Sequence, residues 1–304
     1  MLTPALSFND AQFFHAQARE MPLLVANPGA EEASTHGAVV LLGNFDGLHR
    51  GHRYLVDIAR ARAAALDQRV ALLSMCPHPR RFFRPNAPPF ELDCDVSKID
   101  LLWDAHIDLL VAPVFDEKMA ATSALHFILD FILSRLRPSH VVVGPSYRFG
   151  RGREGDIDFL SNYLGQHDIG VTIGKSFTVD GELCSSSAVR AYLAAGDVAG
   201  ATRLLGRPWR LMRDILWQSA TPAGKQIAEV RVANLIALPA GRYLARVSAA
   251  TEPIEERSYA TAVLDWLPDS LDGATVRLEH QSEGGCGTPL RSGATRIEIL
   301  GQSY

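Results

Sequence analysis

Two histidines three residues apart, His49 and His52, stand in a glycine-rich part of the sequence. The surrounding stretch reads Gly43-Asn44-Phe45-Asp46-Gly47-Leu48-His49-Arg50-Gly51-His52. Glycine permits a tight turn and a close approach of the backbone to a ligand, and imidazole N–H groups can donate hydrogen bonds to a phosphoryl group under attack. This spacing predicts a phosphate-binding loop with two histidine donors.

The residues on either side of this loop predict a buried strand followed by a helix. Residues 38–42 form a continuous apolar run, typical of a strand buried on both faces of a parallel sheet. After the loop, apolar residues recur mostly at three- and four-residue spacing, as in an amphipathic helix: Leu55, Ile58, Ala59, Ala63 and Leu66. A helix that begins at such a turn presents backbone amides and the positive end of its dipole to an anion. Because strand, turn, histidines and helix occur in register, we favour a phosphate site over an ordinary surface turn.

A second group of anion-binding residue types follows Cys184. Ser185, Ser186 and Ser187 stand where a closing helix should begin, and Arg190 lies about one turn further on. Serine caps helices well and leaves backbone amides available for phosphate, while arginine adds charge-assisted hydrogen bonds. Serine caps beside an arginine are also common where no ligand binds, so this group predicts a site only in combination with the first loop.

The unit of strand and helix repeats through the first two-thirds of the chain. Further strands are predicted at 70–75, 109–113, 141–144 and 171–173, and further helices at 96–103, 125–136 and 186–195. This alternation predicts a parallel sheet with helices on both faces, which binds ligands at the carboxyl ends of its strands. Beyond about residue 211, shorter alternating segments predict antiparallel strands, for example at 243–247, 275–278 and 296–299. The fold class is therefore α/β, with a Rossmann-like parallel-sheet domain followed by a smaller, mostly antiparallel, β-barrel-like domain.

We place the domain limits where the pattern changes. Residues 1–36 form a lead-in segment with one short helix expected at 11–20, residues 37–209 form the first domain, and residues 210–304 form the second. The boundary follows Gly206-Arg207-Pro208-Trp209, where glycine and proline end the last helix of the first domain.

Composition excludes several classes of partner. Thirty basic and thirty-four acidic residues give a formal net charge of -4, so no overall positive field exists to attract nucleic acid or an anionic membrane. The four cysteines lack metal-type spacing, and no metal-ligating set is predicted. The start of the chain has no basic stretch followed by an apolar run, so we expect a reduced, cytoplasmic protein.

The histidine loop resembles the signature of the nucleotidyltransferase superfamily: Phe45-Asp46-Gly47 followed by His49, Gly51 and His52. Further segments narrow the resemblance to the FMN adenylyltransferase, or FAD synthetase, module of bacterial bifunctional riboflavin kinase/FAD synthetases. These segments are Cys76-Pro77-His78-Pro79, residues 143–156 and residues 196–208. The resemblance covers roughly residues 39–209.

The resemblance implies direct in-line transfer of AMP from ATP to FMN, which gives FAD and pyrophosphate, with Mg²⁺ assisting and no covalent enzyme intermediate. His49 and His52 would stabilise the α-phosphate region, while Ser185, Ser186 and Arg190 would hold the β- and γ-phosphates. Further ATP-binding residues would be Gly43, Asn44, Phe45, Asp46, Gly51 and Ser187. The flavin side would comprise Pro77, His78, Pro79, Ser146, Phe149 and Gly150. His78 would shape this loop or be purely structural, and Phe149 with Gly150 would wall a flavin or adenine ring or pack internally.

The chain also departs from the family pattern. Ser146 replaces an Asn or Asp, Ala188 replaces an arginine, and Ser187 replaces a threonine of the serine motif. In the second domain, Arg231-Val232-Ala233-Asn234 aligns with the kinase's Pro-Thr-Ala-Asn segment, and valine offers no oxygen to a hard cation. Leu278-Glu279-His280 is a poor match to the expected glutamate strand. We therefore expect riboflavin kinase activity to be absent and the second domain to be a degenerate kinase-like barrel.

Two alternatives remain open beside an enzyme that uses the small-molecule substrates ATP and FMN. One is a nucleotidyltransferase with a different phosphate acceptor, which Ser146 and Ala188 would permit. The other is a catalytically weak paralogue that binds flavin or nucleotide and acts through a partner. The presence of His49, His52 and Arg190 argues against the second alternative.

Overall fold

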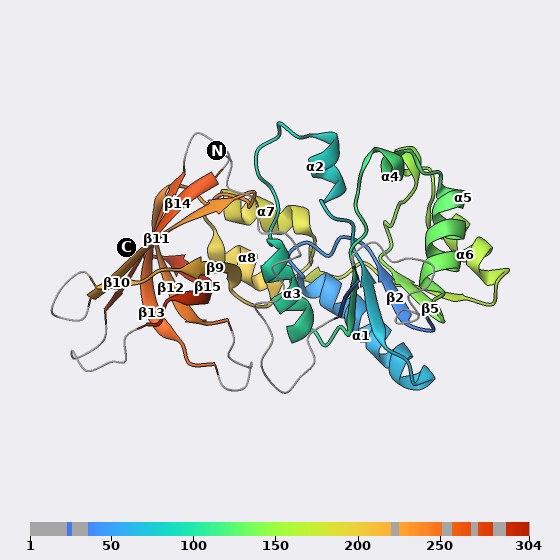
Figure 1. Ribbon diagram of the computed structural model, residues 1–304, viewed down its shortest axis with the longest axis horizontal. Helices are drawn as coiled ribbons and strands as arrows, with labels where there is room; N and C mark the ends of the chain where they lie inside the picture. Colours follow the sequence, from blue (N-terminus) through green and yellow to red (C-terminus); the bar gives the residue numbers. More distant parts are fainter. Residues whose placement is uncertain are drawn as a thin grey trace. The chain divides into compact units, whose positions relative to one another are not determined.

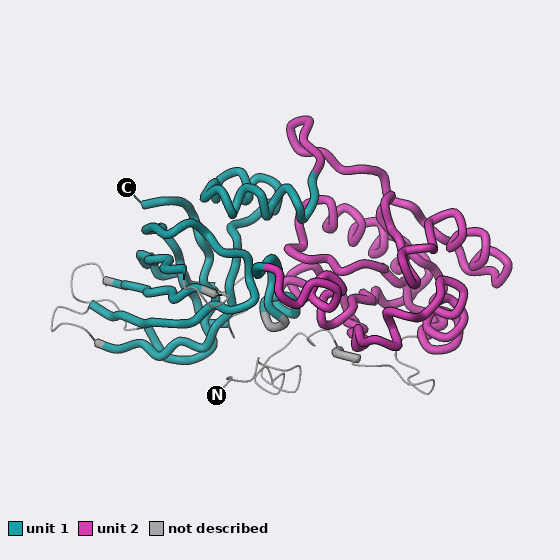
Figure 2. Tube along the Cα trace, turned by 90° about the horizontal axis from the view of Figure 1, so that it is seen from above, with its two compact units in different colours: residues 1–18, 88–100, 184–304 teal, residues 19–87, 101–183 magenta. Residues whose placement is uncertain are grey.

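The structure is a computed structural model that describes residues 23–25, 36–219, 225–250, 257–268, 273–281 and 290–303. The chain forms two compact units (Figure 2): unit 1 comprises residues 1–18, 88–100 and 184–304, and unit 2 comprises residues 19–87 and 101–183. The helix expected at 11–20 lies outside the described residues. The domain limits drawn from the sequence, at 36/37 and 209/210, stay a prediction.

Unit 2 is built on a six-stranded sheet with the strand order β1-β4-β3-β2-β5-β6 (Figure 1). Its strands are β1 (Leu23–Val25), β2 (Val39–Leu42), β3 (Val70–Leu73), β4 (Leu109–Val111), β5 (His140–Val143) and β6 (Gly170–Ile173). Neighbouring strands are parallel throughout, and β2 in the centre pairs with both β3 and β5. This topology confirms the predicted Rossmann-like sheet. Strand β1 falls within the predicted lead-in segment, where three residues give too short a pattern to recognise.

Helices connect these strands. They are α1 (Arg50–Leu66), α2 (Pro79–Phe83), α3 (Asp95–Asp104), α4 (Glu117–Ala121), α5 (Ala124–His126), the π-helix η3 (Phe127–Leu136), the 3-10 turn η4 (Arg151–Arg153) and α6 (Ile157–Gly165). The helix expected at 125–136 is therefore present, with π-type hydrogen bonding over most of its length. None of the helices in the described part of the chain is long and apolar enough to cross a bilayer.

The continuous apolar runs of the strands are explained by burial of both faces of the sheet. Val40 and Leu42 belong to a core cluster with side chains of η3 and α6, among them Phe127, Ile132 and Leu160. Helix α1 packs on β2 and β5. Leu55, Ala59 and Ala63 of its predicted apolar stripe are buried, whereas Ile58 is half-buried and Leu66, the last residue of the helix, is exposed. The sheet is thus a rigid support for the loops at its carboxyl edge.

Unit 1 contains a seven-stranded antiparallel sheet with the order β10-β11-β14-β13-β12-β15-β9 (Figure 1). The strands are β9 (Trp209–Ile215), β10 (Gln218–Ser219), β11 (Lys225–Ala233), β12 (Gly241–Ala249), β13 (Ala260–Pro268), β14 (Gly273–Gln281) and β15 (Gly293–Gln302). This confirms the predicted antiparallel region. Helices α7 (Ser186–Ala194) and α8 (Val198–Leu205) belong to the same unit, and β7 (Thr178–Val179) and β8 (Glu182–Leu183) form a small hairpin in unit 2.

A buried network of ion pairs joins residue 100 to the antiparallel sheet. Asp100 accepts hydrogen bonds of 2.6 Å from Arg210 and from Arg296. Arg210 also donates to Glu298 at 3.0 Å, and Arg246 donates to the other oxygen of Glu298 at 2.6 Å. Burial alone would raise the pKa of Asp100, but the hydrogen bond and charge of Arg296, together with Arg210, hold that pKa below its ordinary value.

Candidate active site

The phosphate loop connects the carboxyl end of β2 to α1. Its backbone takes left-handed conformations at Phe45 (φ 48°), Gly47 (φ 83°) and Leu48 (φ 38°). Glycine adopts such angles without cost, whereas each other residue type costs about 1–2 kcal/mol there. Phe45 and Leu48 are held in place by burial of their side chains. Backbone strain of this kind is concentrated at functional sites, which supports a functional role for this turn.

His49 caps helix α1 with its own ring. Its Nδ1 accepts the backbone N–H of His52 at 3.3 Å, and the residue is only 5% exposed. A ring nitrogen that accepts a hydrogen bond carries no proton, so the neutral His49 ring carries its proton on Nε2. The cap therefore makes Nε2 a hydrogen-bond donor.

Three aromatic rings form a stack at the start of α1. The His52 ring lies 3.7 Å from the His49 ring and 4.5 Å from the Phe45 ring, with interplanar angles of 19° and 22°. Stacking on both faces restricts rotation of the central ring. The structure thus brings His49 and His52 together, side by side, at the end of a helix that offers backbone amides to an anion.

Asn44 links the phosphate loop to the neighbouring loop after β3. Its carbonyl oxygen accepts a hydrogen bond from the Ser74 hydroxyl at 3.1 Å, and its side-chain amide lies 3.3 Å from Nε2 of His78. His78 caps α2 through Nδ1, which accepts the backbone N–H of Arg80 at 3.1 Å. Pro79 is the first residue of α2, and the Cys76–Pro77 peptide is cis. Two of the predicted site segments, 43–52 and 77–79, therefore meet at the carboxyl edge of the sheet.

Phe82 and Phe83 of helix α2 form an aromatic cluster with Phe115, a half-buried residue between β4 and α4. The ring centroids lie 5.2–5.7 Å apart in edge-to-face arrangements. Phe82 is 36% exposed and Phe83 is 62% exposed, which is unusual for large apolar side chains. The sequence analysis did not select these residues, although the adjacent phenylalanines directly after the His78 motif were a usable signal.

The loop after β5 separates an exposed residue from buried ones. Ser146 is exposed, whereas Phe149 packs in the core of unit 2 at 5.6 Å from both Phe127 and Tyr147. Gly150 has φ 76°, and a Cβ there would lie 2.5 Å from the backbone nitrogen of Ala124. These contacts favour a packing role for Phe149 and Gly150. Burial also raises the pKa of the Tyr147 phenol above its ordinary value.

The serine motif lies in unit 1, at the start of α7. Ser185 is the N-cap, and its hydroxyl accepts the backbone N–H of Ala188 at 3.2 Å; Ser186 and Ser187 form the first turn. Nε of Arg190 donates to the carbonyl oxygen of Phe90 at 2.8 Å, and the guanidinium lies 5.3 Å from the centroid of the Phe90 ring. The arginine is thus held by a backbone acceptor and an aromatic face within its own unit.

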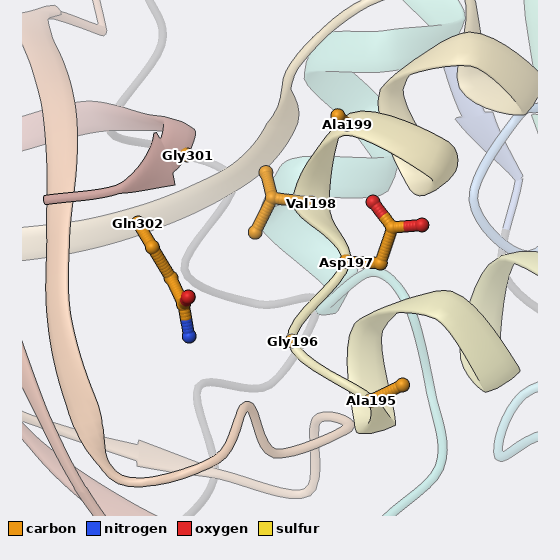
Figure 3. Close-up of a pocket in the computed structure, with 7 residues that line it drawn as sticks. All are labelled: Ala195, Gly196, Asp197, Val198, Ala199, Gly301 and Gln302. Carbon is orange, nitrogen blue, oxygen red and sulfur yellow. The ribbon is translucent and has the colours of Figure 1, made fainter. Parts of the chain in front are cut away.

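A hollow in unit 1 is lined by residues 195–199, Gly301 and Gln302 (Figure 3). Asp197 caps α8 by accepting the backbone N–H of Gly200 at 2.8 Å, and its carboxylate points away from Gln302 (Figure 3). Residues 196–199 belong to a segment that carries the family resemblance, but none of the predicted site residues lines this hollow. It therefore adds nothing to the candidate site.

The described residues contain no group of three or more His, Cys, Asp or Glu side chains that could hold a metal ion. Mg²⁺ commonly keeps several waters and binds through substrate phosphates with one or two carboxylates, so it needs no dedicated protein cage. The side chains described are therefore compatible with Mg²⁺ that arrives together with a nucleotide.

Comparison with known proteins decides the family. Residues 31–188, a little over half of the chain, match the family model described as FAD synthetase. The chain belongs to the FAD synthetase family. The match includes the phosphate loop, the His78 loop, the loop after β5 and the serine motif, and it ends two residues before Arg190. The resemblance inferred from the sequence is confirmed.

Among its relatives, the bifunctional riboflavin kinase/FMN adenylyltransferase of Escherichia coli (strain K12) is 32% identical over 191 residues. That alignment covers 63% of this chain and 61% of the relative, so the FAD synthetase family chain matches about three-fifths of the E. coli protein. The FAD synthetase of Listeria monocytogenes is 30% identical over 186 residues, which cover 59% of this chain and 73% of the relative.

The fold extends further than the sequence similarity. The crystal structure of the Macrolide-efflux Protein from Streptococcus pneumoniae is similar with a TM-score of 0.76, and it covers 92% of this chain and 91% of that chain. The two sequences are 19% identical, so this likeness is one of fold alone. The antiparallel unit of this FAD synthetase family chain thus accompanies the parallel unit in another protein as well.

Proposed function

We propose that the protein is an FMN adenylyltransferase, which transfers AMP from ATP to FMN and releases FAD and pyrophosphate. The observation that carries this proposal is the pair of stacked imidazoles at the start of α1, in a chain of the FAD synthetase family. His49 caps the helix through Nδ1, so the neutral ring carries its proton on Nε2, which can only donate. Helix amides and imidazole donors together suit the charge that develops on a phosphoryl group.

In the proposed reaction, a phosphate oxygen of FMN forms a bond to the α-phosphorus of ATP. The bond between the α-phosphorus and the oxygen bridging to the β-phosphorus breaks, and pyrophosphate leaves with that electron pair. His49 and His52 stabilise the charge on the α-phosphate oxygens, and the loop residues Gly43, Asn44, Phe45, Asp46 and Gly51 hold the nucleotide. No side chain has to exchange a proton, so positioning and charge stabilisation supply the rate enhancement.

The serine motif is a second phosphate-binding group in this proposal, at the first turn of α7. The Ser185 cap leaves the amides of Ser186 and Ser187 at the helix start, and Arg190 follows on the same helix. Mg²⁺ bound to the triphosphate neutralises part of its charge. The guanidinium of Arg190 adds a positive charge for the phosphates that does not depend on a bound metal ion.

The aromatic cluster of Phe82, Phe83 and Phe115 is the platform for the flavin ring in this proposal. Exposed edge-to-face phenyl rings offer an apolar surface to a flat aromatic ligand. His78, which caps the helix that carries Phe82 and Phe83, contacts Asn44 of the phosphate loop, and this contact supports a flavin site next to the loop. The exposed Ser146 lies in a separate loop of the same unit and lines the acceptor side.

Riboflavin kinase activity is absent in this proposal. Val232, which stands where the kinase pattern has a threonine, is a buried strand residue with no oxygen to offer a cation. Glu279, the nearest match to the kinase glutamate, forms an ion pair of 3.1 Å with Lys225 on the neighbouring strand. Both observations support a structural role for the antiparallel sheet.

The test is an assay of the purified protein with Mg-ATP and FMN, and separately with Mg-ATP and riboflavin, followed by chromatographic separation of the flavins. We expect FAD from FMN and no FMN from riboflavin. Formation of FMN would contradict the loss of kinase activity. Saturable flavin binding without any turnover would instead favour a binding protein, and adenylylation of another phosphate monoester would identify a different acceptor.

A further inference from the structure

Asn44 is held from both sides at the carboxyl end of β2. Its carbonyl oxygen accepts the hydroxyl of Ser74, and its side-chain amide meets Nε2 of His78, 34 residues away in the sequence. Ser74 follows β3 directly, and His78 begins the helix that comes next. Asn44 is therefore in contact with both ends of the segment that leads from β3 to α2.

The protons on His78 can be assigned from its partners. The backbone N–H of Arg80 can only donate, so Nδ1 of His78 is an acceptor and carries no proton. The neutral ring then carries its proton on Nε2, where it must donate. The Asn44 atom that faces this nitrogen in the structure is the amide nitrogen Nδ2, at 3.3 Å, and two N–H donors cannot bond to each other. A half-turn of the amide about its last torsion leaves its shape unchanged and brings the acceptor Oδ1 to this position.

We propose that Asn44 is a positioning residue whose Oδ1 accepts the Nε2–H of His78. This hydrogen bond fixes the flavin-binding helix α2 to the phosphate loop. This inference rests on the proposed function for its flavin partner. Both ring nitrogens of His78 are then engaged, Nδ1 with the cap of α2 and Nε2 with Asn44. His78 accordingly orients α2 and transfers no proton.

The consequence concerns the acceptor substrate. Helix α2 has only five residues, and its cap is the first link between the sheet and the exposed Phe82 and Phe83. Without the contact to Asn44, the start of α2 loses its anchor on the phosphate loop. Loss of one neutral hydrogen bond should therefore raise the KM for FMN by about 2- to 10-fold, with a smaller change in kcat.

Two substitutions remove the contact from opposite ends. Asn44→Ala deletes the acceptor and keeps the His78 cap. His78→Asn keeps a good N-cap for α2 but is too short to reach Asn44. The exposed Asn162 on α6 provides the matched control, since Asn162→Ala should leave the KM for FMN unchanged.

The double variant is the decisive measurement. If the two residues act through one hydrogen bond, the KM for FMN of Asn44→Ala/His78→Asn should not exceed that of the weaker-binding single variant. Multiplication of the two single effects would overturn the proposal, as would an Asn44→Ala enzyme with the KM of the Asn162→Ala control.

A readout independent of turnover separates this inference from the proposed function. ¹⁵N NMR of the wild-type His78 ring should show an unprotonated Nδ1 and a protonated Nε2 whose hydrogen exchanges slowly, and Asn44→Ala should speed that exchange. A protonated Nδ1, or an exchange rate that Asn44→Ala leaves unchanged, would refute the contact. A protein that makes no FAD would refute the proposed function, and the ring measurement would still decide the role of Asn44.

Discussion

The phosphate loop of unit 2 and the ion network of unit 1 both bury polar side chains, but they stabilise them by different means. In the network, two carboxylates and several guanidinium groups compensate one another, as in the contacts of Asp100 with Arg210 and Arg296. In the loop, two imidazoles are oriented by a helix cap and by ring stacking. Charges that neutralise each other hold a fold together, whereas oriented hydrogen-bond donors suit a ligand that brings its own charge.

The parallel and antiparallel sheets also differ in whether their polar groups are arranged for a ligand or for each other. At the carboxyl edge of the parallel sheet lie the strained turn of the phosphate loop and two histidines that cap helices, His49 and His78. The antiparallel sheet carries a buried valine and a paired glutamate at the positions where the kinase pattern expects metal and nucleotide contacts. These observations support our proposal that the chemistry belongs to the parallel sheet and that the antiparallel sheet has a structural role.

The largest expected effect is on stability and comes from Asp100→Asn. Removing the carboxylate leaves Arg296 buried without a compensating charge and leaves Arg210 with Glu298 alone, which should cost about 3–5 kcal/mol of the free energy of unfolding. Urea denaturation of the two proteins measures this difference. A loss below 1 kcal/mol would show that the network does not hold the unit together.

Asp265→Asn is the matched control, because Asp265 forms a solvent-accessible pair with Arg242 at 2.9 Å in the same sheet. Water screens that pair, so the loss should be much smaller. The pKa of Asp100 is held below 3.8, so its stabilisation is present at neutral pH and is lost only when the pH falls through the lowered value. Asp100→Asn should therefore also flatten the acid side of the stability profile.

The next effect is on catalysis and comes from His52→Ala. Loss of a preorganised donor should lower kcat for FAD formation by roughly 100-fold. The exposed His167 at the end of α6 gives the control, since His167→Ala should keep full activity. Steady-state kinetics with Mg-ATP and FMN measures both, and unchanged turnover in His52→Ala would remove that ring from the mechanism.

Substitution of His49 separates capping from catalysis. Asparagine is a good N-cap and alanine is a poor one, so His49→Asn should be more stable than His49→Ala by about 1 kcal/mol. Both variants lack the Nε2–H donor, and their kcat values should fall by similar factors. Thermal unfolding and kinetics of the pair test this, and recovery of activity in His49→Asn would mean that the cap is the whole role of this ring.

The smallest effect is the pH dependence at His140. This buried ring meets Thr172 Oγ1 at 2.8 Å, and burial, with the charge of Arg62, lowers the pKa of His140. The neutral form is preferred in the folded state, so stability should fall as the pH drops below about 6.5, the unfolded value. His140→Gln should weaken that dependence, which thermal unfolding at a series of pH values measures. An identical slope in both proteins would exclude His140 as its source.

Much of the fold and the centre of the site are predictable from local sequence. The apolar run before Gly43 and the amphipathic spacing after it gave β2 and α1, because each pattern reflects neighbouring residues in one element. The short strand β1 and the five-residue α2 carry too little periodicity. Contacts between distant residues are also beyond sequence patterns: Asn44 meets His78 across 34 residues, and Asp100 meets Arg296 across 196.

The packing of aromatic side chains also could not be read from local sequence patterns. Phe149 was a plausible ring wall from its place beside glycine, but it lies in the core with Phe127 and Tyr147. The sequence analysis did not select Phe82 and Phe83, although they follow the His78 motif, and their exposure becomes visible only in the fold. Burial, which depends on the whole fold, distinguishes the core residue Phe149 from the more exposed Phe82 and Phe83.

The central proposal is that the imidazole of His49, which caps α1, and the imidazole of His52, which stacks on it, bind the α-phosphate of ATP. The most direct test is a titration of the ¹⁵N-labelled protein with the non-transferable analogue α,β-methylene-ATP, observed at the ring nitrogens of these two residues. We predict saturable shifts at both rings, with Nδ1 of His49 unprotonated throughout and the shifts of His49 retained in His167→Ala. Binding of the analogue with no change at either ring would contradict the account.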